Sequence, residues 1–220
     1  MFKSRLRLVT HVLAFAVLCM TADLSNAQAD LVSIFIVRHP ETDASQASQP
    51  VVPLSELGKQ RAALLVPTLR DVKFTHMFAS HTTRSRQAIE GVAAKHGLSV
   101  VQMPAPGSPF EGQPVTDQTT RRAPIEPIAA ALTKLPAGSV ALVGLNSENI
   151  YAILNKLGVP VAREGQPCSQ GSMCVPCTDN TCFPRDEFDS LWYLKRDQAR
   201  NDVVAYTQVR YGAGWRPGGH

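Results

Sequence analysis

The sequence predicts an α/β fold, a three-layer α/β/α sandwich around a mostly parallel sheet. Short apolar segments alternate throughout with segments of helical periodicity. The first apolar segment, Leu31–Val37, is continuous and β-branched, which is typical of a strand buried on both faces of a parallel sheet. The 220 residues, 44% hydrophobic and 18% charged, suit one globular domain and argue against disorder or a coiled coil.

Residues 1–29 are expected to be a secretory signal, which leaves one domain over residues 30–220. Basic residues precede the apolar run Val9–Met20, and Ala27-Gln28-Ala29 has the small-x-small form of a cleavage site. An uncleaved membrane anchor is the alternative, but the run is short and His11 interrupts it. The sequence therefore predicts export to the periplasm or the exterior, with no stable membrane anchor after cleavage.

Charge argues against a nucleic-acid partner. Removal of the predicted signal takes away three basic residues and one acidic residue, which lowers the formal net charge from +4 to +2. A protein that binds nucleic acid through its backbone phosphates needs a concentrated basic surface. A mature chain of this charge has no such electrostatic signature.

The first half of the chain contains three expected strands and two helices. After the first strand and a polar loop, Ser55 is placed to cap a helix that runs to about residue 69. A strand is expected over 74–79, followed by a helix over about 84–96 that ends at a glycine, and a short strand over 99–102. Residues 104–114 hold four prolines and two glycines, so we expect a loop there.

The second half continues the alternation. A helix over about 124–135 ends at Pro136, and an apolar strand then starts at Val140 and reaches a glycine turn at Gly144. A helix over about 147–157 follows. Strands over 188–194 and 203–209 complete the expected sheet.

Four cysteines lie close together in a predicted loop over about residues 164–183. In an exported protein, the first interpretation is two disulfide bonds that staple a surface loop. Four thiolates around zinc are the alternative, although the spacing gives one close Cys-x-x-Cys pair where zinc ribbons have two. The pairing stays open, because four cysteines allow three connectivities. The candidates are Cys168, Cys174, Cys177 and Cys182. We expect no resident metal or other cofactor.

Polar residues at three strand ends are the candidate site, because ligands of open α/β sheets bind beyond the carboxyl ends of the strands. The first pair, Arg38-His39, follows the most apolar strand. A guanidinium there needs an anionic partner, and phosphate accepts its planar fork through two oxygens. A neutral imidazole beside it can attack phosphorus. An ion pair between Arg38 and Glu41 is the simpler alternative.

The second strand end supports a phosphate site. Arg84 lies at the start of a predicted helix, where its charge opposes the helix dipole unless an anion is also held there. The amino terminus of a helix is itself an anion site, and neighbouring hydroxyls could contribute donors.

The motifs at these strand ends resemble the histidine phosphatase superfamily, which includes phosphoglycerate mutases and acid phosphatases. "FIVRHPETD" resembles the Arg-His-Gly-Glu-Thr block of that family, and "LSELGKQRA" its following helix. "FASHTTRSRQAIE" is similar to the Ser-Ser-x-x-x-Arg segment, and "VALVGLNSENIYAILNKLG" to the Val-Gly-His-Ser-Asn-Thr turn and helix. Four blocks in the same order make the resemblance specific, and it implies a phosphoglycerate mutase-like fold.

The resemblance also implies roles for individual residues. His39 takes the place of the nucleophile that becomes phosphohistidine, Arg38 and Arg84 those of phosphate ligands, and Thr42 that of a further donor. The family's proton donor is an acidic residue after the third strand, for which Glu111 is the candidate.

Two positions depart from the family pattern. Pro40 replaces a glycine. More seriously, Leu145 or Asn146 stands where the family has its second active-site histidine, whose loss costs on the order of 3 kcal/mol of transition-state stabilisation. The amide of Asn146 could restore part of it, and His81 is the other histidine in a candidate site loop. We therefore expect an exported phosphomonoesterase of reduced activity. The alternative is an inactive relative that binds a phosphorylated ligand or a protein partner.

Overall fold

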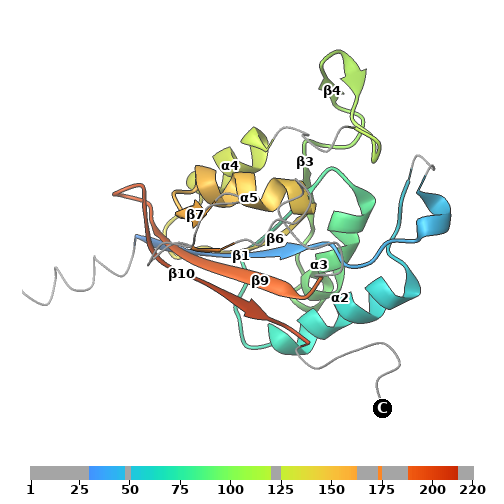
Figure 1. The fold of residues 1–220 in the computed structure, drawn as a ribbon. Coiled ribbons are helices and arrows are strands. Elements are labelled where there is room, and N and C mark those ends of the chain that lie inside the picture. Colours follow the sequence, from blue (N-terminus) through green and yellow to red (C-terminus); the bar gives the residue numbers. More distant parts are fainter. Residues whose placement is uncertain (1–29, 48–50, 120–124, 163–172, 175–187, 213–220) are drawn as a thin grey trace, which may run out of the picture.

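A six-stranded mixed sheet forms the centre of the molecule. The structure is a computed structural model that describes residues 30–47, 51–119, 125–162, 173–174 and 188–212 (Figure 1). The strand order is β10-β9-β1-β6-β2-β3, in which β1, β6, β2 and β3 run parallel and β9 is antiparallel to both of its neighbours. The strands are β1 (Leu31–Arg38), β2 (His76–Ser80), β3 (Val101–Met103), β6 (Val140–Leu145), β9 (Ser190–Asp197) and β10 (Asp202–Arg210).

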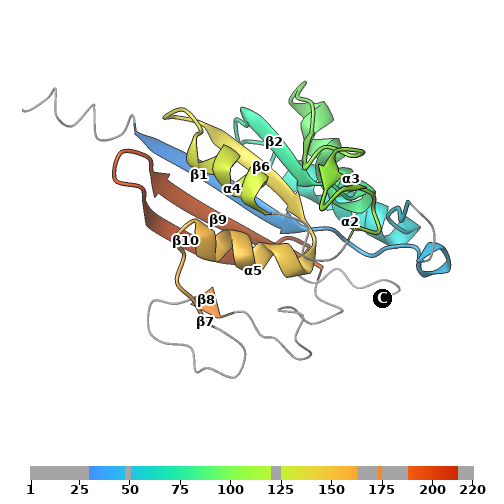
Figure 2. The same cartoon turned by 90° about the horizontal axis from the view of Figure 1, so that it is seen from above.

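Helices cover both faces of this sheet, which confirms the predicted three-layer α/β/α sandwich. One face carries α2 (Glu56–Thr68) and α3 (Thr83–Lys95), and the other carries α4 (Glu126–Thr133) and α5 (Ser147–Lys156) (Figures 1 and 2). The Ser55 hydroxyl accepts a hydrogen bond from the Gly58 amide and so caps α2 as the sequence predicts. The helix expected over 124–135 is shorter at both ends.

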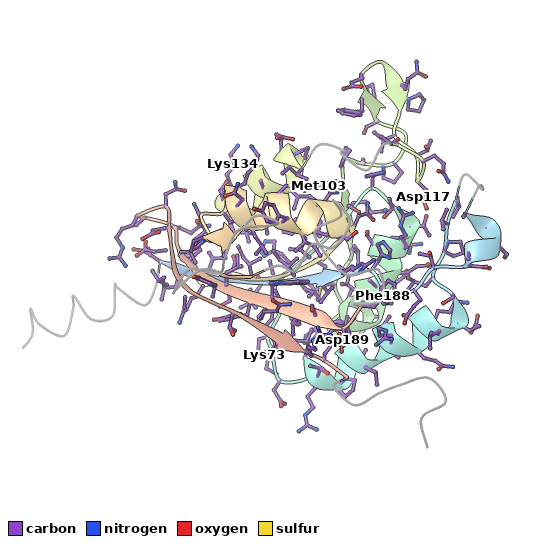
Figure 3. The ribbon with its side chains drawn as sticks, in the orientation of Figure 1. Lys73, Met103, Asp117, Lys134, Phe188 and Asp189 are labelled. Atoms are coloured by element: carbon purple, nitrogen blue, oxygen red, sulfur yellow. The ribbon has the colours of Figure 1, made fainter. Side chains whose placement is uncertain are left out.

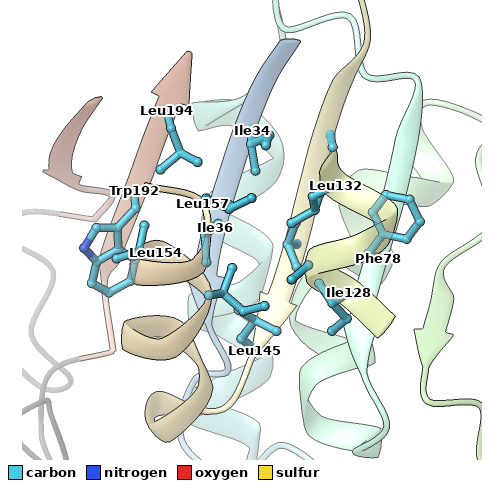
Figure 4. Packing of buried hydrophobic residues seen from close by; sticks show 14 of the residues in the cluster. Ile34, Ile36, Phe78, Ile128, Leu132, Leu145, Leu154, Leu157, Trp192 and Leu194 are labelled. Atoms are coloured by element: carbon cyan, nitrogen blue, oxygen red, sulfur yellow. The ribbon is translucent and has the colours of Figure 1, made fainter. Parts of the chain in front are cut away.

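Two apolar clusters fill the space on either side of the sheet. Ile34 and Ile36 of β1 point into the cluster under α4 and α5, together with Trp192 of β9 (Figure 4). Val37 points to the opposite face, into the cluster under α2 and α3. β1 contributes buried side chains to both clusters, which explains why its sequence is continuously apolar rather than alternating.

The carboxyl ends of β1, β6 and β2 meet at one edge of the sheet. Arg38 pairs in register with Leu145, and one further backbone hydrogen bond, 2.9 Å long, runs from the His39 amide to the Leu145 carbonyl. At Gly144 a Cβ atom would lie 2.3 Å from the Ser85 carbonyl oxygen, so glycine lets α3 pack directly on β6. The first turn of α3 is thereby held beside the ends of β1 and β6.

The proline-rich segment 104–114 is not wholly irregular. It contains a short hairpin of β4 (Pro109–Phe110) and β5 (Gln113–Pro114), which stands away from the body of the fold in Figure 1. Positive φ angles at Glu111 and Gly112 give the two-residue turn that suits a tight hairpin. Proline content predicted a loop here because it counts against strands, but a two-residue strand needs few ladder hydrogen bonds.

Several sequence-based predictions fall outside the described residues. The proposed signal, residues 1–29, is one of them, and so are Cys168, Cys177 and Cys182. Of the cysteine segment, the structure describes the backbone of β8 (Met173–Cys174), which pairs with β7 (Val161–Ala162). In the part of the chain that is described, no helix is long and apolar enough to cross a membrane. A short 3-10 turn, η1 (Ala44–Gln46), follows the first strand.

Candidate active site

A polar cavity of about 430 Å³ opens beyond the carboxyl ends of β1 and β6. Five of the predicted site residues line it, which places all three candidate strand ends at one site. The predicted residues in its lining are Arg38, His39, Thr42, Arg84 and Asn146. Ala47, Val52, Asp117, Gln118, Thr119 and Ser147 complete the described lining.

His39 is held in the tautomer that a nucleophile requires. Its Nδ1 lies 2.8 Å from the Pro40 carbonyl oxygen, which can only accept a hydrogen bond, so Nδ1 carries the proton. The other ring nitrogen, Nε2, then has a lone pair and accepts a hydrogen bond of 3.3 Å from Nε of Arg84. The lone pair of the imidazole thus points to the guanidinium that would bind an oxyanion.

The surroundings keep this imidazole neutral. Burial, the charge of Arg84 and the charge of Arg38 together lower the pKa of His39 to about 3, against the opposing effect of the Pro40 carbonyl. A histidine of ordinary pKa would be partly protonated in mildly acidic solution and could not attack phosphorus in that form. His39 is instead available as a nucleophile throughout the neutral and mildly acidic range.

Arg84 lies in the first turn of α3, and a carboxylate distant in the sequence binds the residue before it. The N-cap residue Thr82 makes no side-chain capping bond. Asp117 accepts hydrogen bonds from the Thr83 amide at 2.9 Å and from the Thr83 hydroxyl at 3.2 Å. Its other oxygen accepts from the Val52 amide at 3.0 Å. Asp117 therefore caps the helix and ties two loops together at the edge of the cavity.

Asn146 follows β6 and lines the cavity together with Ser147. Leu145 is fully buried in the core under α5, so of the two residues that the sequence left open, Asn146 is the one that lines the cavity. Hydroxyls of Thr82 and Ser85 contact the Asn146 Oδ1 atom at 3.1 and 3.0 Å. With that oxygen held by α3, the amide nitrogen is the end of the side chain left for a ligand.

Glu41 does not pair with Arg38, the alternative that the sequence left open. Its two carboxylate oxygens bind Arg61 of α2, which donates from Nε and Nη2 over distances of 2.5–3.1 Å. Arg38 instead lies against an aromatic ring, with its guanidinium carbon 4.3 Å from the centroid of Phe188. The phosphate-binding candidate is thus stabilised by a π face rather than by this carboxylate.

Two other predicted residues lie outside the cavity lining. Glu111 is exposed on the β4–β5 hairpin, so its role as proton donor stays a prediction. His81 is buried at 2% exposure, and neither ring nitrogen makes a hydrogen bond of normal geometry within the described residues. Burial lowers the pKa of His81 more than nearby Thr119 and Asp117 raise it. His81 is therefore a neutral residue behind the site.

Asp117 and Phe188 are the site residues that sequence reasoning missed. Asp117 lies in the same inter-strand region as Glu111, so a search of that region for acidic residues would have found it as a second candidate. The apolar pattern places Phe188 at the start of a core strand, and no local pattern connects it with Arg38. Among the described residues, no group of three or more His, Cys, Asp or Glu side chains could hold a metal ion.

The geometry defines a class of protein: an α/β protein whose sheet edge presents a neutral imidazole between two arginines. A model of the family described as "Histidine phosphatase superfamily (branch 1)" matches residues 34–105, which include Arg38, His39 and Arg84. The fructose-2,6-bisphosphatase TIGAR of Bos taurus is 40% identical over 68 residues, and that of Mus musculus is 37% identical over 68. Each match covers 29% of this chain and 25% of the relative.

A solved structure supports the fold over most of the chain. The protein histidine phosphatase SixA, complexed with tungstate, superimposes with a TM-score of 0.53 at 16% identity, over 83% of this chain and 99% of that one. The family-model match spans about a third of the chain and includes three of the four motifs that resemble the histidine phosphatase superfamily. The aligned segment spans about a quarter of the length of the TIGAR proteins.

The lowered pKa of His39 predicts how stability depends on pH. The unfolded chain, with an ordinary histidine pKa of about 6.5, binds a proton between pH 6.5 and 3 that the folded chain does not bind. The free energy of unfolding should therefore fall as pH decreases through this window, by up to about 1.4 kcal/mol per pH unit from this residue. Urea unfolding from pH 7.5 to 4.5 should show a shallower decline for His39→Gln than for the native chain. Parallel curves would contradict the neutral state of His39.

Proposed function

We propose that this chain is a phosphomonoesterase that works through a phosphohistidine at His39. The observation that carries the proposal is the contact between Arg84 Nε and His39 Nε2, with Nδ1 fixed by the Pro40 carbonyl. This arrangement places the lone pair of His39 Nε2 next to the positive charge of Arg84, so both can act on the same phosphoryl group. The match of residues 34–105 to a model of the histidine phosphatase superfamily supports the same proposal.

The reaction would proceed in two displacements. The Nε2 lone pair of His39 attacks phosphorus, the bond between phosphorus and the ester oxygen breaks, and the leaving oxygen takes a proton from a carboxylic acid. Water then attacks the phosphohistidine, the P–N bond breaks, and the carboxylate takes up a proton from the water. The net change converts a phosphate monoester and water into an alcohol and phosphate. Arg38, Arg84, Thr42 and Asn146 would bind the three non-bridging oxygens.

The substrate we propose is a small phosphorylated molecule, and the site of action is outside the cytoplasm. A cavity of about 430 Å³ accommodates a metabolite-sized ester. Support for export comes from the basic residues, apolar run and small-x-small motif of residues 1–29.

Hydrolysis of a generic aryl phosphate tests the enzymatic proposal. The mature chain should release phosphate well above the rate of His39→Ala, because the variant lacks the atom that accepts the phosphoryl group. Rapid acid-free quenching should also trap a phosphorylated native chain, and none should be trapped in His39→Ala. Equal turnover by the two proteins would sink the proposal.

A second candidate function, oxyanion binding without turnover, is favoured by Asn146. A neutral amide stabilises developing charge less than a cationic imidazole does. The native protein would then bind tungstate but hydrolyse no ester. Arg38, Arg84 and His39 are all present, so we expect such an inactive protein still to bind the oxyanion.

Asn146→Asp measures what the amide contributes. The new carboxylate keeps an acceptor for Thr82 and Ser85 but places a negative oxygen where the amide nitrogen faced the cavity. Tungstate affinity and kcat should both fall, each by on the order of a hundredfold or more, since a donor is lost and like charges meet. Calorimetric titration and steady-state kinetics provide the readouts. Affinity within about twofold of the native value would show that Asn146 does not face the ligand.

Two carboxylates are candidates for the proton donor, and the geometry favours Asp117 over Glu111 because Asp117 lines the cavity. Asp117→Asn should lower kcat for an alkyl phosphate by about a hundredfold, because a poor leaving group needs a proton. Its effect on a nitrophenyl ester, whose leaving group needs none, should be much smaller. Glu111→Gln is the matched variant. If it shows the leaving-group dependence and Asp117→Asn does not, Glu111 is the acid.

A further inference from the structure

Phe188 contacts the phosphate-binding candidate Arg38 from the side of β9. Arg38 is buried, with 8% of its surface exposed, and its guanidinium carbon lies 4.3 Å from the centre of the Phe188 ring. A buried guanidinium is costly unless other groups stabilise its charge. The nearest carboxylate in sequence, that of Glu41, is engaged by Arg61. The aromatic ring is one of the groups that support this cation.

An aromatic face stabilises a guanidinium in a different way from a carboxylate. A carboxylate would bind the same N–H groups that a phosphate needs, and it would cancel the charge that attracts the phosphate. An aromatic ring accepts no hydrogen bond from the in-plane N–H groups when it stacks on a guanidinium, so it does not compete with an oxyanion for them. The contact thus favours one orientation of the side chain without competing with the ligand.

The Phe188 backbone is itself fixed by residues at the end of β10. The Tyr211 hydroxyl donates to the Phe188 carbonyl at 2.9 Å, and the Tyr211 amide donates to the Asp189 carbonyl at 2.9 Å. The Arg210 side chain forms an ion pair with Asp189 at 2.6 Å. Tyr211 is 2% exposed, so this anchor lies in the core. Phe188 and Asp189, the two residues that precede β9, are labelled in Figure 3.

We propose that Phe188 is a positioning residue that holds Arg38 in the orientation that binds phosphoryl oxygens. Tyr211 anchors it for this purpose, so the end of the last strand of the sheet supports a ligand-binding residue of the first. The inference rests on the proposed function only in taking the ligand of Arg38 to be a phosphoryl group or a similar oxyanion.

The experiment measures tungstate and phosphate affinity by calorimetry in Phe188→Leu, Phe188→Tyr and the native chain. Leucine keeps most of the apolar volume but has no π face, so affinity should fall by about three- to thirtyfold. Tyrosine keeps the ring and should retain affinity within about twofold. Phe110→Leu, on the β4–β5 hairpin, is the matched control for loss of a phenylalanine, and it should bind as the native chain does.

A double-mutant cycle separates positioning from general damage. In an Arg38→Gln background, Phe188→Leu should have no further effect on affinity, because the cation that the ring positions is gone. Additive losses in the double variant would mean that Phe188 acts through something other than Arg38. If Phe188→Leu does not fold, Tyr211→Phe serves instead. Tyr211→Phe removes the hydroxyl that fixes the Phe188 carbonyl. It should weaken binding when Arg38 is present and have no further effect in the Arg38→Gln variant.

The outcomes distinguish this inference from the proposed function. Native protein that binds tungstate but shows no turnover, with Phe188→Leu weakened, would support the inference and reject the enzyme. Turnover with equal affinity in native protein and Phe188→Leu would reject the inference and leave the enzyme standing. Absence of any oxyanion binding by the native protein would overturn both.

Discussion

The hydrogen bond from the His39 amide to the Leu145 carbonyl is the contact on which the site depends. It continues the parallel β1–β6 ladder by one step, so the residue that follows β1 is fixed against the last residue of β6. His39 and Asn146 consequently face the same cavity from adjacent strands. A parallel ladder in the interior of a sheet has little freedom to shift, because a one-residue slip would turn every buried side chain to the opposite face.

The two buried arginines Arg38 and Arg61 have different partners: Arg61 binds Glu41, and Arg38 lies over the ring of Phe188. Glu41 follows His39 by two residues, and Arg61 of α2 binds both of its oxygens. The helix approaches so closely that a Cβ atom on Gly58 would lie 2.1 Å from the Glu41 carbonyl oxygen. Arg61 therefore fixes the segment after His39, and it also keeps the Glu41 carboxylate away from Arg38. The ion pair matters here for its geometry and for what it prevents, more than for net stability.

The amino-acid sequence alone indicated the layers of the fold and most of the site, because both depend on local pattern. β1 is continuously apolar and α2 is capped by Ser55, so Arg38, His39, Arg84 and the β6 turn could be placed at one edge of a sheet. Choosing between Leu145 and Asn146 required knowing which side of the strand end each faces. Asp117 and Phe188 reach the site from segments whose position depends on tertiary packing, and no periodicity relates them to Arg84 or Arg38.

Asn146 has a consequence that goes beyond rate. An imidazole at this position would gain or lose charge near neutral pH, and its affinity for an anion would change with that charge. The amide does not titrate, His39 stays neutral down to a pKa of about 3, and the two arginines remain charged at every physiological pH. Around neutrality, the electrostatic field that these four side chains direct at the ligand is constant. Variation of binding across that range would then report mainly the second ionisation of the phosphate itself, so the pocket would discriminate a dianion from a monoanion without a protein switch.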